Sequence, residues 1–142
     1  MLRNMDLQHY MVPDPVTVAP TASLFEAMHL ILANKISGLC VVDEERKLIG
    51  ILSELDCLRG VLGAVYNDAG VGIVSDVMAT ENLKTAGIHD NVADVAADML
   101  SGAKRRRPVI DSEGRLIGQI TIRQLLRAVK EFSCAPDPTE AD

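Results

Sequence analysis

The chain has 142 residues, of which 48% are apolar, and a formal net charge of −6. This length fits one compact domain or two small repeats that share a core, and the apolar fraction is sufficient for that core. The acidic balance and the few aromatic residues (two Tyr, two Phe, no Trp) argue against a general nucleic-acid binder, because phosphate neutralisation needs clustered cations and base stacking needs rings.

The first half of the chain predicts alternating strands and helices. In order these are a lead-in with a short helix over 1–10, a short strand over 16–18, a helix over 23–34, strands over 38–42 and 47–52 joined by a hairpin turn, and a helix over 53–62. Ser23-Leu24-Phe25-Glu26 is a capping-box pattern that precedes apolar residues at helical spacing.

The second half predicts the same order after a glycine-containing loop over 63–74 and a single-turn helix start over 75–78. Its elements are a short strand over 83–85, a helix over 91–102, strands over 106–110 and 115–120, and a helix over 121–132. The tail, over 132–142, holds two Pro and acidic residues without basic ones, so we expect it to be disordered.

A shift of 68 residues aligns Ser23–Val61 with Asn91–Val129 without a gap. About ten of some forty positions are identical, including Val41/Val109, Asp43/Asp111, Leu48/Leu116, Ile49/Ile117, Gly50/Gly118 and Arg59/Arg127. Each repeat is a β-α-β-β-α unit that is too small to bury its sheet alone. We therefore expect an α+β fold in which two repeats pack with pseudo-two-fold symmetry, with the sheets inside and the helices outside.

A strand that runs directly into a helix recurs in both repeats. In Leu48–Asp56, Ser53 stands at the N-cap position and Asp56 follows at N3. In the second copy, Thr121 is the cap and Gln124 the N3 residue. Capping alone explains both pairs, because Ser-x-x-acid at the start of a helix needs no ligand.

This doubled pattern resembles the CBS domain, the repeat named after cystathionine β-synthase. The resemblance rests on Gly38–Asp43 and Leu48–Asp56, and on their second copies, Arg107–Asp111 and Leu116–Thr121, with Met11 and Met78 where each repeat begins. The boundaries that it implies are a first repeat over 8–65, a connecting loop over 66–75, a second repeat over 76–131 and the tail.

The resemblance implies a tandem pair, or Bateman module, with two clefts between the repeats. Such clefts bind adenosine compounds: AMP, ADP, ATP, S-adenosylmethionine or NAD. Pairs of this kind regulate an attached or separate protein and often form homodimers. The sequence shows no attached catalytic domain, so we expect a module that is not an enzyme, has no obligatory cofactor, takes AMP or ATP first, and signals to a separate, unknown partner.

By the same resemblance, Ser53 and Asp56 contact the ribose and phosphate of the ligand. Arg105 and Arg106, in the run Lys104–Arg107, come from the other repeat and face the phosphates, although a solvated basic patch explains this run equally well. Ile51, Ala79 and Lys84 are expected around the base and sugar.

The second cleft departs from this pattern because Gln124 replaces the carboxylate and no cation stands in Ile36-Ser37-Gly38, the counterpart of the basic run. We expect that cleft to be empty or weak.

An alternative to nucleotide sensing is a ligand-independent homodimer or interaction module. The apolar residues that favour it are Leu55, Leu58, Val61, Leu62, Leu125, Leu126 and Val129.

The remaining chemistry is sparse. Cys40, Cys57 and Cys134 are widely spaced without a C-x-x-C, so we expect inert thiols rather than a disulfide framework or zinc site. The three histidines share no metal-ligand spacing, so we expect no metal. No run of about 18 apolar residues occurs, and the first ten residues lack a signal-peptide core, which favours a cytoplasmic protein without a membrane span.

Overall fold

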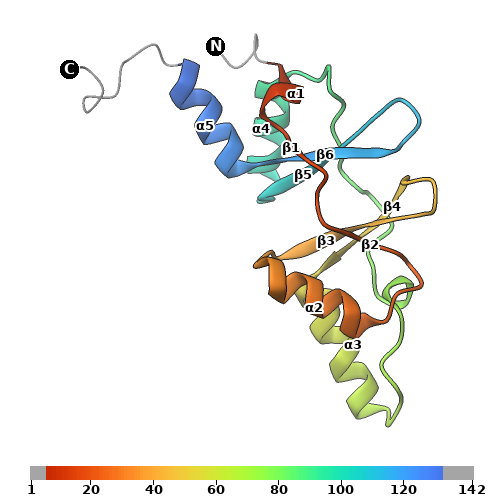
Figure 1. Ribbon diagram of the computed structural model, residues 1–142. Coiled ribbons are helices and arrows are strands. Elements are labelled where there is room, and N and C mark those ends of the chain that lie inside the picture. The colour runs from red at the N-terminus through yellow and green to blue at the C-terminus, as the bar shows by residue number, and fades with distance from the viewer. Residues whose placement is uncertain (1–5, 133–142) are drawn as a thin grey trace.

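A computed structural model describes residues 6–132 of the chain. It has two halves, each with a small sheet and covering helices, and the two sheets lie between the helices of one half and those of the other (Figure 1). The expected α+β fold of two repeats is confirmed. The predictions for Cys134 and for a disordered tail beyond Phe132 lie outside the described residues.

The first half contains a three-stranded sheet in the order β2-β3-β4. Its elements are β2 (Thr17–Val18), α2 (Leu24–Asn34), β3 (Gly38–Val42), β4 (Leu48–Ser53) and α3 (Glu54–Tyr66). Strand β2 runs parallel to β3, and β3 runs antiparallel to β4. The two helices cover one face of the sheet because they carry an apolar stripe. The core between them includes Leu24, Ala27, Ile31, Leu39, Val41, Leu52 and Cys57.

The second half contains a sheet in the order β1-β6-β5. Its elements are α1 (Leu7–Tyr10), β1 (Val12–Pro13), α4 (Val92–Ser101), β5 (Arg106–Ile110), β6 (Leu116–Thr121) and α5 (Ile122–Phe132). Residues 7–13 thus belong to the second half, where β1 pairs antiparallel with β6. Leu7 and Tyr10 of α1 lie in the same core as Val109 and Ile120.

A reciprocal exchange completes the first half. The 3-10 helix η2 (Val74–Asp76) buries Val74 in the first core, although in sequence it lies at the beginning of the second repeat. Ala79 then forms a bridge with Ile51 of β4, as β1 does with β6. Each half is therefore completed by the first segment of the other repeat.

Two glycines permit this exchange. A Cβ on Gly50 would lie 2.6 Å from the Sδ of Met78, and one on Gly118 would lie 2.7 Å from the Sδ of Met11. The carbonyl oxygens of Ala79 and Val12, in the same crossing segments, would lie 3.1 Å and 2.9 Å from these two Cβ atoms, so a larger residue would force the segment to shift. The glycine in each Leu-Ile-Gly stretch therefore allows the crossing segment of the other repeat to approach the strand closely.

Two expected elements differ from the structure. Residues 83–85 form no strand, and only Ala86 bridges to Val109. Pro108 stands where β3 has Cys40, and because proline has no backbone N–H, β5 offers this segment one ladder bond fewer. Helix α3 extends to Tyr66 rather than ending near Leu62, so the loop expected over 63–74 begins later.

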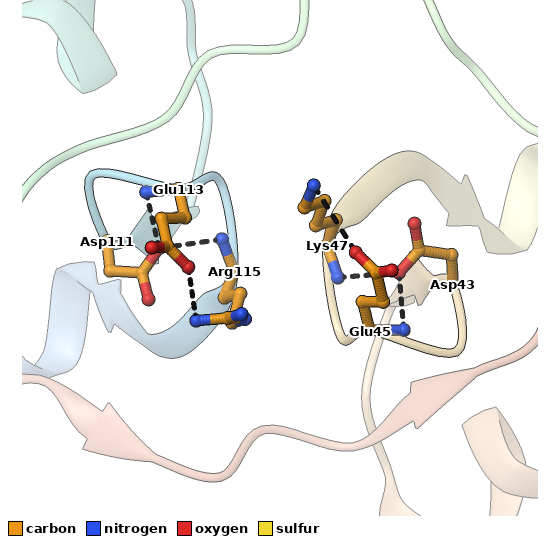
Figure 2. A network of polar contacts seen from close by, with 6 residues as sticks. All are labelled: Asp43, Glu45, Lys47, Asp111, Glu113 and Arg115. Atoms are coloured by element: carbon orange, nitrogen blue, oxygen red, sulfur yellow. Dashed lines mark hydrogen bonds and ion pairs between the residues drawn. The ribbon is translucent and has the colours of Figure 1, made fainter.

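The two β-hairpin turns meet where the halves join (Figure 2). The Oδ1 of Asp43 accepts hydrogen bonds from the N–H groups of Glu45 and Lys47, both at 2.9 Å, and Asp111 does the same for Glu113 and Arg115. The hairpins also bond to each other. The N–H of Leu48 donates to Gly114 O at 3.1 Å, and that of Leu116 donates to Arg46 O at 2.9 Å.

The second core contains one buried charge that the first core lacks. Arg107 is 5% exposed, and its Nη2 lies 2.7 Å from the Oδ2 of Asp98 on α4. Its Nε is buried without a hydrogen-bond partner. The corresponding residues of the first half, 68 positions earlier, are Leu39 and Leu30, which pack as apolar side chains. An ion pair has thus replaced an aliphatic contact.

We predict that Asp98→Ala lowers the free energy of unfolding by on the order of 3 kcal/mol, because it leaves the buried guanidinium without its counter-ion. The double substitution Asp98→Leu with Arg107→Leu restores the arrangement of the first half, so it should be neutral or stabilising. Urea unfolding of both variants checks this. A double variant less stable than Asp98→Ala would contradict the assignment.

The hydrogen bonds to Asp111 in the second hairpin predict that the stability of the fold depends on pH. The N–H of Arg115, followed by that of Glu113, lowers the pKa of Asp111. A lowered pKa in the folded state stabilises the protein above the unfolded value of about 3.9, and this stabilisation disappears as the pH falls through the folded value. Asp111→Asn should therefore be less stable than wild type at pH 7, and the difference should shrink below about pH 4.

Thermal unfolding between pH 7 and pH 2.5 measures this difference, with Glu44→Gln as control. Glu44 is an exposed carboxylate of the other hairpin, and the structure gives its side chain no hydrogen bond within residues 6–132. A stability difference that stays constant over this range would contradict the role given to the Asp111 carboxylate.

Candidate ligand-binding site

The start of helix α3 is fixed by a reciprocal pair of hydrogen bonds. The Oγ of Ser53 accepts from the N–H of Asp56 at 3.1 Å, and the Oδ2 of Asp56 accepts from the N–H of Ser53 at 2.9 Å. This is the capping box predicted from the sequence. It holds a hydroxyl and a carboxylate side by side at the positive end of a thirteen-residue helix.

The second oxygen of Asp56 takes no part in the cap and forms an ion pair. Its Oδ1 lies 3.2 Å from the Nη1 of Arg59, in an ion pair whose two side chains are 17% and 73% exposed. Such a pair contributes on the order of 0.5 kcal/mol, so breaking it costs little. The cap bond and the ion pair thus use different oxygens of one carboxylate.

Ile51 and Ala79 lie beside this helix start. The N–H of Ile51 donates to Ala79 O at 3.0 Å, and the N–H of Ala79 donates to Ile51 O at 2.8 Å. In β4, Ile51 and Ser53 point to the face opposite the fully buried Leu52, because side chains alternate along a strand. An apolar side chain, an exposed crossing segment and the cap hydroxyl therefore share the face of the sheet away from α2 and α3.

Arg106 reaches this region from the second half. Its Nη1 donates to Gly38 O at 3.1 Å, and its Nη2 donates to the Oγ of Ser37 at 2.9 Å. Gly38 is the partner of Ser53 in the β3–β4 ladder, and Ser37 O accepts the N–H of Glu54, the first residue of α3. The structure therefore brings this cation to the strand end that carries the cap.

Arg105 and Lys84, which were also expected at the site, lie apart from the Ser53–Asp56 cap. Both are exposed, and within residues 6–132 the structure gives neither side chain a hydrogen bond or ion pair to Ser53 or Asp56. The backbone of Arg105 instead accepts the N–H of Ile122 at 3.0 Å, as Ser37 does for α3. Of the basic run, Arg106 faces the first half and Arg107 points into the second core.

The corresponding region of the second half contains an open pocket of about 330 Å³. Its lining residues are His9, Tyr10, Met11, Val12, Pro13, Gln124, Arg127 and Glu131. Thr121 caps α5 by accepting the N–H of Gln124 at 3.1 Å, as predicted. The Tyr10 hydroxyl donates to Glu131 at 3.0 Å, and burial together with this carboxylate raises the pKa of Tyr10.

Sequence reasoning missed most of these lining residues, among them the polar ones His9, Tyr10, Arg127 and Glu131. The match between Arg127 and Arg59 was a usable signal, since Arg59 lies beside Asp56 in the first repeat. Nothing local indicated that α1 contacts α5. This pocket holds a neutral amide where the first half has a carboxylate, so its chemistry differs from that of the Ser53 region.

The two described thiols are poor nucleophiles. Burial raises the pKa of Cys40 to about 11, although Arg106 and Arg46 oppose this shift, and burial also raises the pKa of Cys57, to which the Asp56 carboxylate adds. Both therefore stay protonated at neutral pH. Within residues 6–132 no three His, Cys, Asp or Glu side chains are grouped as metal ligands, and no helix has the length and apolar character to cross a bilayer.

Comparisons with known proteins identify the family. The family model described as CBS domain matches residues 6–63 and 74–131. The inosine-5'-monophosphate dehydrogenase of Aquifex aeolicus is 41% identical over 130 residues, which cover 89% of this chain and 25% of that enzyme. The chain thus spans about a quarter of the length of the dehydrogenases that it matches.

Two solved structures are similar over nearly the whole chain. CBSX2, a protein of Arabidopsis thaliana solved in complex with AMP, is 27% identical with a TM-score of 0.80, over 92% of this chain and 99% of that one. The CBS domain pair of protein MJ0100, solved with 5'-methylthioadenosine and S-adenosyl-L-methionine, is 25% identical with a TM-score of 0.72, over 87% and 98%. The chain belongs to the CBS domain family and carries two CBS domains in tandem.

Proposed function

We propose that the chain is a regulatory module that binds an adenosine ligand at the start of α3 and signals to a separate protein. The observation that carries this proposal is Arg106, which crosses from the second half to Ser37 and Gly38 beside the Ser53–Asp56 cap. The AMP complex of CBSX2 supports the ligand class, because that pair has the same fold over nearly all of this chain.

Each group has a role in this proposal. Asp56 accepts hydrogen bonds from the two ribose hydroxyls, and the Ile51–Ala79 pair contacts the base and sugar. Ser53 and the first amides of α3 receive a 5'-phosphate, since a helix N-terminus favours an anion. Arg106 donates to the same phosphate from the opposite side. The two repeats are then joined through the ligand.

The local charge favours a phosphate-bearing ligand. Lys104, Arg105 and Arg106 follow one another at the start of β5, and a sulfonium group such as that of S-adenosylmethionine would meet like charge there. AMP or ATP is therefore our first expectation among the adenosine compounds. A metal is not part of this proposal, and neither is catalysis. A change in how the two halves associate would carry the signal to a separate, unknown partner.

A second candidate function is self-association, because α3 exposes an apolar stripe. Its members are Leu55, Leu58, Leu62, Val65 and Tyr66, and Leu126 and Val129 are exposed on the related helix α5. Two of the apolar residues that the sequence offered for a dimer have other roles. Leu125 of α5 lies in the second core, and Val61 of α3 packs against the first core. An exposed stripe of this size favours a homodimer that buries α3.

We predict that AMP or ATP raises the melting temperature of the protein. At a hundred times its dissociation constant, a ligand stabilises the folded state by about 2.7 kcal/mol. Asp56→Asn keeps an acceptor for the cap but removes the negative charge that binds the ribose, so it should reduce this shift strongly. Glu54→Gln, an exposed neighbour in the first turn of α3, is the matched control and should keep it.

The series should include ADP, NAD, S-adenosylmethionine and adenosine. A shift that persists unchanged in Asp56→Asn would place the ligand elsewhere. If none of these compounds shifted the melting temperature, self-association would be the favoured function instead.

For the dimer, we predict that Leu58→Glu yields a monomer by sedimentation velocity, since it places a charge in the middle of the stripe. Leu58 is 56% exposed, so the fold should tolerate this change. Leu100→Glu on α4, where the leucine is 74% exposed, is the control and should leave the mass unchanged. A wild-type monomer at micromolar concentration would refute this second function.

A further inference from the structure

Arg106 has a fixed position although it is a long side chain near the surface. Both of its terminal nitrogens donate to first-half acceptors, at 2.9 Å to the Ser37 Oγ and 3.1 Å to Gly38 O. An unrestrained arginine has many rotamers, and ordering it on binding costs free energy. Here that ordering is supplied by the protein itself.

These two bonds leave donors available. A guanidinium carries five N–H groups, and Ser37 and Gly38 each accept one. The Nε–H and one N–H on each terminal nitrogen remain for an anion. The contact with Ser37 is therefore compatible with a phosphate on the same guanidinium, and it sets the direction in which those donors point.

Within residues 6–132 the arrangement occurs once, despite the internal repeat. The residue 68 positions before Arg106 is Gly38, and the one 68 positions after Ser37 is Arg105. Thus the second half has no serine at the position that orients the cation, and the first half has no cation at the position of Arg106. Only the α3 side receives an oriented guanidinium.

From this geometry we propose that Ser37 is a positioning residue, which orients Arg106 so that the α3 site selects adenosine ligands with a 5'-phosphate over those without one. This rests on the proposed function and adds a determinant of ligand selectivity. Ser37 is exposed and its side chain contacts Arg106 rather than the core, so the effect is transmitted through the arginine.

The test compares the dissociation constants of AMP and adenosine by isothermal titration calorimetry. Ser37→Ala should weaken AMP binding by about 5- to 10-fold, in the range of one ordinary hydrogen bond, and leave adenosine within about 2-fold. Ser37→Thr keeps the hydroxyl and should restore the AMP preference. Ser101→Ala, an exposed serine at the end of α4, is the matched control.

A double-mutant cycle with Arg106→Ala tests whether Ser37 acts through Arg106. This variant should lose the preference for AMP, and adding Ser37→Ala to it should cause no further change, because the residue through which Ser37 acts is gone. An AMP-to-adenosine ratio that Ser37→Ala leaves unchanged, or a further loss in the double variant, would overturn the positioning role while the nucleotide site stands. If wild type bound neither compound, the proposed function would fail and this inference with it.

Discussion

Neither half of this molecule can complete its sheet with its own repeat. The edge of β6 is covered by β1, which opens the first repeat, and the edge of β4 is covered by Ala79, near the beginning of the second repeat. An uncovered edge would leave backbone N–H and C=O groups without partners. The two repeats are therefore one structural unit, and the relation between them is set by main-chain hydrogen bonds.

This constraint also places the candidate site. Ile51 is held against Ala79 by the exchange, and Arg106 is held against Ser37 by the contact between the starts of β3 and β5. The paired hairpins, bonded through Leu48 and Leu116, fix the opposite ends of the same strands. A ligand at α3 would thus touch parts of the chain whose separation is already determined.

What could be predicted from the sequence depended on the range of the interaction. The capping box of Ser53 and Asp56, the hairpin turns and most helix limits follow from signals within a few residues, and the structure has them. The position of Arg106 beside the first repeat followed from the family resemblance. Local signals were insufficient where the partner is distant. They placed a strand at 83–85, which Pro108 in β5 does not support, and they could not show α1 against α5.

Burial of Arg107 illustrates the same limit within one run of charge. Four consecutive basic residues read as a solvated patch, yet two of them have specific partners, Arg106 across the repeats and Arg107 in the core. The alternation of a strand explains this, since neighbours in β5 point to opposite faces. Only the acceptors on the other elements decide which cation is exposed and which is paired.

The exchange of the end segments has a consequence for how the chain folds during synthesis. Val12 pairs with Gln119, so β1 leaves the ribosome long before its partner exists, and the first sheet waits in turn for Ala79. Contacts between segments so far apart in sequence cost much chain entropy, and they cannot form before both segments have been synthesised. A nascent chain that ends within the connecting loop would expose two unfinished edges. The boundary between the repeats in the sequence is therefore not a boundary between folding units.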